Sequence, residues 1–420
     1  MNVLHHAIDL SLSLAPPLLT GKGEVQVEVL RHTAVVRLDA HELELASVAT
    51  SAGPQRFSRV GDHLCIELAE PLQAGSKLTL KLAWKVSTSG KVPRFSPGQV
   101  WAGYRASAWM PTLQDSSQRA TLRLSITTSP ELKVAASGRA DGQRPDGNGL
   151  VVHSFTLDHP TPPFLYGFAA GVFDEATQAV KDLRLRALGP AGSDLAGALR
   201  ITAAIHDVLL ERTGAPLAAA EYTQVFVEGD AAQEAAGVSF LAAEALDDVR
   251  KDPTEDWIFT HELAHQWFGW QLPCVDFADF WLNEGFATFM VAVVKEQRWG
   301  RPAYERELGL WRERSVRVHA EGHDAPVSLS RPSAPLRRPP QDSELQVRGV
   351  TYARGALVLD KLRRELGDAV FWAAIRAYVQ SHRLPVGVRR EDLRLSLEAT
   401  SGRDLRGFFE RWVYTSAPDL

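Results

Sequence analysis

The strongest constraint on the fold is a change in hydrophobic periodicity near residue 174. Before this point apolar and polar residues alternate, which is typical of half-buried antiparallel strands. Such stretches are Glu24–Val29, Lys77–Leu82 and Ala120–Ile126. After it, apolar residues recur at helical spacing from Asp194 to Glu211, and Glu221–Glu228 is predicted to add one strand before the pattern becomes mainly helical.

The length of the chain indicates that the change in periodicity marks a boundary between domains. Because one hydrophobic core rarely serves 420 residues, the chain is expected to form more than one domain. We predict an α+β multidomain protein, with a β-rich N-terminal domain over residues 1–175 and a mainly helical domain over residues 176–420 that begins with a small sheet.

The composition of the chain argues against nucleic acid and membranes as partners. The formal net charge is −5 and no long basic stretch occurs, so nucleic acid is not expected as a partner. No run approaches the roughly 20 apolar residues of a membrane span, so no membrane partner is expected. The N-terminus lacks the pattern of a secretory signal, which favours a cytoplasmic protein. The two cysteines, Cys65 and Cys274, are predicted to be buried thiols.

One segment differs in composition from its surroundings. Arg331–Gln341 (RPSAPLRRPPQ) is rich in proline and arginine. Proline excludes helix interiors and discourages strands, so this segment is predicted to be a surface loop.

The segment His261–His265 (HELAH) has the HExxH pattern of zinc hydrolases. Residues four apart lie on one face of a helix, so both imidazoles can bind one ion. Asp252 is predicted to cap this helix, with Pro253 in its first turn. Glu262, beside a ligand, is the predicted general base.

A zinc site in a hydrolase needs a third protein ligand and an open position for water. Glu284 is the candidate, because it lies in Trp281–Ala287 (WLNEGFA), where a second amphipathic helix begins. A turn at Leu272 and Pro273 can place the two helices side by side. The sequence therefore predicts one zinc ion held by His261, His265 and Glu284.

These segments resemble the M1 family of zinc aminopeptidases, in the gluzincin clan. The family has HExxH, eighteen residues and then a glutamate, which is the spacing from His265 to Glu284 here. Further segments that resemble the family are Trp109–Ala120, Phe164–Phe173, Tyr352–Ala356 and Phe408–Trp412. The resemblance implies a saddle-like β domain and a thermolysin-like catalytic domain. The chain stops at Leu420, where the family usually continues into a helical C-terminal domain.

The resemblance also implies roles for two further residues. Tyr352 matches the tyrosine whose hydroxyl stabilises the oxyanion. Glu234 matches the glutamate of the GAMEN motif, which binds the free α-amino group of the substrate. The matching segment is Ala231–Ala235 (AAQEA), in which only Ala232 and Glu234 are identical to the motif. The glycine, methionine and asparagine of the motif are replaced, and the later Gly237 also agrees with the family.

The favoured function is removal of N-terminal residues from peptides that have a free N-terminus. Two alternatives stay open on these residues. A zinc endopeptidase would use the same HExxH chemistry without an amine anchor, and the altered motif around Glu234 keeps that alternative open. A non-catalytic peptide-binding protein of the same fold is the other, against which the intact catalytic set argues.

Overall fold

The computed structural model describes residues 1–328, 341–384 and 386–416. The chain divides into two compact units. The first unit comprises Met1–Leu199 and Ala219–Leu246, and the second comprises Arg200–Ala218 and Asp247–Leu420.

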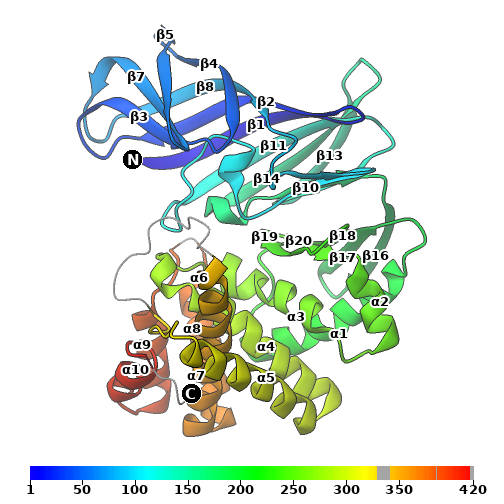
Figure 1. The fold of residues 1–420 in the computed structure, drawn as a ribbon, viewed down its shortest axis with the longest axis vertical. Coiled ribbons are helices and arrows are strands. Elements are labelled where there is room, and N and C mark those ends of the chain that lie inside the picture. Colours follow the sequence, from blue (N-terminus) through cyan, green and yellow to red (C-terminus); the bar gives the residue numbers. More distant parts are fainter. Residues whose placement is uncertain (329–340, 385, 417–420) are drawn as a thin grey trace. The chain divides into compact units, whose positions relative to one another are not determined.

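The largest sheet of the first unit has eight strands (Figure 1). Its strands are β1 (Asn2–Leu14), β2 (Pro17–Glu28), β4 (Leu43–Thr50), β5 (Gly53–Pro54), β8 (Lys77–Val86), β11 (Ala120–Thr128), β13 (Arg139–Pro145) and β14 (Val151–Thr161). They lie in the order β13-β14-β11-β1-β2-β8-β4-β5, antiparallel except for the parallel pair β1 and β11. Apolar side chains at alternate positions of β11 are buried, which explains why this strand is visible in the sequence.

Two smaller sheets complete the N-terminal part of this unit. One has three strands in the order β3-β7-β6, and the other has four in the order β12-β15-β10-β9. The bounds are β3 (Thr33–Asp39), β6 (Arg56–Val60) and β7 (His63–Leu72) for the first, and β9 (Arg94–Ser96), β10 (Gln99–Ala102), β12 (Lys133–Ala136) and β15 (Phe168–Gly171) for the second.

The last sheet of the first unit has five strands. It consists of β16 (Asp174–Val180), β17 (Leu183–Gly189), β18 (Glu221–Val227), β19 (Ala232–Ala235) and β20 (Val238–Ala242), in the order β16-β17-β18-β20-β19. β18 is parallel to both of its neighbours and is buried along nearly its whole length, as expected for a central strand. β16 and β19 are the two edge strands.

The second unit is mainly helical (Figure 1). Among the described residues, the α-helices are α1 (Leu195–Thr213), α2 (Glu244–Lys251), α3 (Trp257–Ala264), α4 (Trp281–Trp299), α5 (Arg301–Ala320), α6 (Gln341–Gln346), α7 (Gly355–Leu366), α8 (Asp368–His382), α9 (Arg390–Ser401) and α10 (Arg406–Trp412), with α1 and α2 each beginning in the first unit. Two π-helical segments, Gln266–Gln271 and Val347–Arg354, follow α3 and α6.

Helix α4 is the central element of the second unit. With the turn before it, Phe277–Trp299 is long and apolar enough to cross a membrane, yet 94% of its most apolar window is buried in the structure. It packs against α3, α5 and α7. Its apolar character is therefore that of a core helix.

The predicted fold class is confirmed, with a β-rich N-terminal part and a mainly helical C-terminal part. The three predicted strands correspond to β2, β8 and β11, the predicted helix to α1 and the additional strand to β18. Both cysteines are buried free thiols, as predicted. The predicted domain boundary between residues 175 and 176 stays a prediction. The compact units follow contacts between residues, and such units do not define domain boundaries.

The predicted start of the HExxH helix is wrong. The Asp252 side chain accepts hydrogen bonds from the backbone N–H and hydroxyl of Thr254, and this local turn ends before the helix begins. Helix α3 begins at Trp257. The predicted loop Arg331–Gln341 lies outside the described residues, except for Gln341, where α6 begins.

Candidate metal centre

The predicted metal ligands of the second unit lie on α3, directly after α3 and on α4. His261 lies on α3, and His265 directly follows that helix, with its backbone N–H donating to the carbonyl of His261 at 3.2 Å. This helical step turns both imidazoles to one side. Glu284 lies in the first turn of α4. All three residues are buried.

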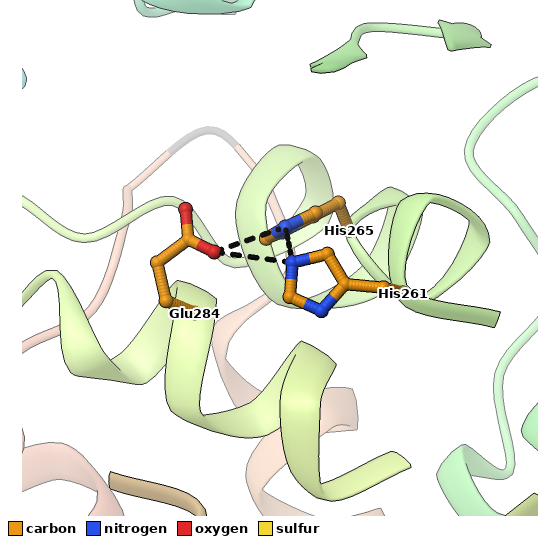
Figure 2. A group of neighbouring side chains, drawn as sticks. All are labelled: His261, His265 and Glu284. Atoms are coloured by element: carbon orange, nitrogen blue, oxygen red, sulfur yellow. Dashed lines mark hydrogen bonds and ion pairs between the residues drawn. The ribbon is translucent and has the colours of Figure 1, made fainter. Parts of the chain in front are cut away.

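The three side chains converge on one point (Figure 2). The Nε2 atoms of His261 and His265 are 3.1 Å apart, and each lies 3.3 Å from Oε2 of Glu284. The two nitrogens and the oxygen therefore form a nearly equilateral triangle, and each residue offers one ligand atom to its centre.

This triangle fits a zinc ion. Nitrogen and carboxylate ligands bind zinc at roughly 2.0–2.2 Å, so two ligand atoms of a tetrahedral site lie roughly 3.3–3.5 Å apart. The distances of 3.1–3.3 Å are close to that separation. Two imidazoles and one carboxylate are also the ligand set of known catalytic zinc sites with an open fourth position.

The protonation state of the cluster suits a cation. Burial lowers the pKa of His261, and this effect outweighs the neighbouring Glu284, which raises it. Burial also works against ionisation of Glu284, but His265 and His261 outweigh it and lower the pKa of that carboxyl to about 2. A neutral imidazole at His261 and an ionised carboxylate at Glu284 are forms that bind metal.

A backbone carbonyl orients the ring of His265. Nδ1 of His265 lies 3.0 Å from the carbonyl oxygen of Phe268. Because a carbonyl only accepts hydrogen bonds, Nδ1 carries the proton and Nε2 directs its lone pair to the triangle. Such partners fix the tautomer and orientation of a metal-binding histidine.

The carbonyl of Phe268 depends on an unusual backbone conformation. Phe268 and Gly269 leave helical geometry, and Gly269 has φ 157° and ψ −62°. An L-residue rarely adopts this conformation. A Cβ atom at position 269 would also lie 3.3 Å from Nδ1 of His265. This role of Gly269 was not predicted from the sequence, although a glycine four residues after the second histidine was the available signal.

Asn283 holds the loop between the two helices. Its side-chain oxygen accepts a hydrogen bond from the backbone N–H of Cys274 at 3.2 Å, and the residue is fully buried. Asn283 directly precedes Glu284, so this bond ties the first turn of α4 to the preceding loop. Its role was also missed, because nothing in the sequence indicates where the loop returns.

The structure brings two further predicted residues to this cluster. Glu262 is buried on α3, and one of its carboxylate oxygens lies within 4.8 Å of a ring nitrogen of His265. Tyr352 lies in the π-helical segment Val347–Arg354 and stacks on the ring of His261, with centroids 5.8 Å apart and planes 8° apart. The roles of both residues stay predictions.

The sixth predicted residue, Glu234, belongs to the first unit. It lies on the edge strand β19, is buried, and is paired in register with Ser239 of β20. Five of the six predicted residues are thus gathered in the second unit, and the sixth belongs to the first unit.

The amino-acid sequence of this chain is similar to those of known peptidases. Residues 226–412 match the model of the peptidase family M1 domain. Aminopeptidase N of Streptomyces lividans is 31% identical over 162 residues, which is 37% of this chain and 18% of that protein. Probable aminopeptidase 1 of Saccharolobus solfataricus is 22% identical over 396 residues, or 90% of this chain and 49% of that protein. The chain therefore matches half or less of the length of these relatives.

Solved structures extend the likeness to the whole chain. The M1 zinc metallopeptidase of Deinococcus radiodurans has a TM-score of 0.78 and 23% identity, and covers 99% of this chain and 94% of that one. A mutant of that protein bound to a Tyr-Ser-Ala substrate has a TM-score of 0.79 and 23% identity, with the same coverage. At this identity the likeness shows the fold.

Proposed function

We propose that the chain is a zinc-dependent aminopeptidase that hydrolyses the N-terminal peptide bond of peptides, because residues 226–412 match the model of the peptidase family M1 domain. The observation that carries this proposal is the triangle of His261, His265 and Glu284, whose edges of 3.1–3.3 Å fit one zinc ion. When bound, zinc supplies Lewis-acid chemistry that polarises a carbonyl and makes water more acidic.

The residues around the triangle would carry the proton transfers. Glu262 accepts a proton from the attacking water and passes it to the leaving amine, a role that suits a buried carboxylate beside a ligand. The Tyr352 hydroxyl donates a hydrogen bond to the oxyanion as negative charge develops there. The stacking of Tyr352 on His261 supports this assignment, since it places the tyrosine ring against a metal ligand.

Glu234 is the proposed anchor for the substrate's α-ammonium group. It is a buried carboxylate on an edge strand, and an ionised carboxylate accepts charge-assisted hydrogen bonds from an ammonium group. An anchor of this kind is what distinguishes an aminopeptidase from an endopeptidase with the same HExxH chemistry.

The test compares aminoacyl fluorogenic amides that have a free α-amine with their N-acetylated counterparts, with and without a zinc chelator. We expect cleavage of the free-amine substrates, loss of cleavage with the chelator, and recovery when zinc is returned. Glu234→Ala should lower kcat/KM for free-amine substrates roughly 30- to 5,000-fold, because leaving the ammonium group unpaired typically costs about 2–5 kcal/mol. Equal cleavage of both substrate types would instead indicate an endopeptidase, and no cleavage with zinc bound would indicate a peptide-binding protein.

A further inference from the structure

The residue before Glu234 departs from the family motif and contacts Glu234 directly. Gln233 stands where the motif has methionine. Its side-chain nitrogen Nε2 donates a hydrogen bond to Oε2 of Glu234 at 2.5 Å. The same nitrogen lies 3.3 Å from the backbone carbonyl oxygen of Glu234. An amide nitrogen has two N–H groups, so both donors of Gln233 serve residue 234.

The aliphatic part of the Gln233 side chain, its stem, packs near Phe240 and Gly103 of the first unit. Gln233 pairs in register with Phe240 of β20, and the Phe240 ring stacks on Trp101 with centroids 5.6 Å apart. Gly103 lies close to this side chain, and a Cβ atom at position 103 would be 2.7 Å from Cγ of Gln233. A glycine at position 103 is therefore required for this placement of the side chain.

The hydrogen bond restricts the carboxylate without neutralising it. A free glutamate side chain is among those that lose most rotamer freedom when it is fixed. The amide of Gln233 is neutral, so it holds one carboxylate oxygen without cancelling the negative charge of the carboxylate. A lysine at this position would donate as well but would cancel the charge.

We propose that Gln233 is a positioning residue that orders the Glu234 carboxylate in advance for the α-ammonium group of the substrate. The inference rests on the proposed function, because it assumes that Glu234 binds the amine. It adds that the amine affinity of this chain is set by a side chain that the family's methionine cannot imitate, since a thioether donates no hydrogen bond.

The first test is Gln233→Met, which keeps the length of the side chain and removes both donors. The probes are leucine hydroxamate and its des-amino analogue, measured as competitive inhibitors of the zinc-loaded full chain. We expect the Ki of leucine hydroxamate to rise about tenfold, which is typical for loss of one hydrogen bond to a charged group. The Ki of the des-amino analogue and kcat should change less than about twofold.

A control and a second variant keep the test decisive. Gln178→Met makes the same substitution on β16, the opposite edge strand of the same sheet, and should leave both Ki values unchanged. Gly103→Ala displaces the stem of Gln233 while keeping its amide, and should raise the Ki of leucine hydroxamate selectively, as Gln233→Met does. Melting temperature and zinc content of each variant identify a general defect.

The outcomes separate the inference from the function on which it rests. If the wild-type protein cleaves free-amine substrates and binds the two hydroxamates with different affinities, but neither Gln233→Met nor Gly103→Ala changes their ratio, the positioning role is refuted and the proposed function stands. If the wild-type protein does not distinguish the two hydroxamates, both ideas are refuted together.

Discussion

Replacing Gly269 by alanine should weaken metal binding without removing any ligand. The carbonyl of Phe268 reaches Nδ1 of His265 only because Gly269 adopts φ 157° and ψ −62°. An alanine in such a conformation is strained by about 1–3 kcal/mol. Its Cβ atom would also lie 3.3 Å from Nδ1 of His265, which is tighter than most contacts of a Cβ atom.

The chain can relieve this strain by rotating the peptide between Phe268 and Gly269. The rotation removes the carbonyl from His265, and the imidazole then loses the partner that fixes its tautomer and orientation. Loss of such an outer partner typically lowers metal affinity by about 10–100-fold. We therefore expect Gly269→Ala to bind zinc about 10–100-fold more weakly than the wild-type protein.

The assay is competition for zinc against a chromophoric chelator of known affinity. Gly367→Ala is the matched control, because Gly367 also has a positive φ of 78° but a Cβ atom there would have no neighbour within 4 Å. Both variants should lose stability in the metal-free state, and only Gly269→Ala should lose zinc affinity. Equal zinc affinity of the two variants and the wild-type protein would refute the role of the Phe268 carbonyl.

The remaining predictions concern the two proposed catalytic residues and one buried histidine. Glu262→Gln should keep its zinc, measured by emission spectroscopy, and lose about 10²–10⁴-fold in kcat, and near-normal turnover would contradict its role as base. Tyr352→Phe should lower kcat with little change in KM, because its hydroxyl acts on charge of the transition state, and a change in KM alone would indicate a binding residue. Burial lowers the pKa of His6 from 6.5 to about 3, so unfolding takes up a proton between those pH values, and His6 reduces stability by roughly 1.4 kcal/mol per pH unit as pH falls below 6.5. The loss of unfolding free energy from pH 7 to pH 5 should therefore be roughly 2 kcal/mol smaller in His6→Leu, measured by urea denaturation, and an equal loss would contradict this.

Local periodicity predicted the strands β2, β8, β11 and β18 and the helix α1, and residue spacing predicted that His261, His265 and Glu284 lie together. The four-residue spacing of His261 and His265 needs only one turn of helix, and Glu284 follows at a spacing that two adjacent helices can close. The alternation in β11 reflects the burial of alternate side chains. These features depend on residues that are near in sequence, so the sequence alone contains them.

The features that were missed depend on backbone geometry or on distant segments. The start of α3 shifted because Asp252 binds Thr254 in a turn instead of capping the helix. The carbonyl partner of His265 needs the conformation of Gly269, which no periodicity encodes. The bond from Gln233 to Glu234 needs the space at Gly103, more than a hundred residues earlier.

The parallel pairing of β1 with β11 bears on how the chain is made. His5 pairs with Thr121, 116 residues later, so β1 has only β2 as a partner until β11 leaves the ribosome. At about 5–20 residues per second, that interval lasts roughly 6 to 23 s. During it one edge of β1 is open, and an open strand edge is a template for pairing with another chain. Slowing translation before Thr128 would lengthen this interval and increase the fraction of chains lost to aggregation.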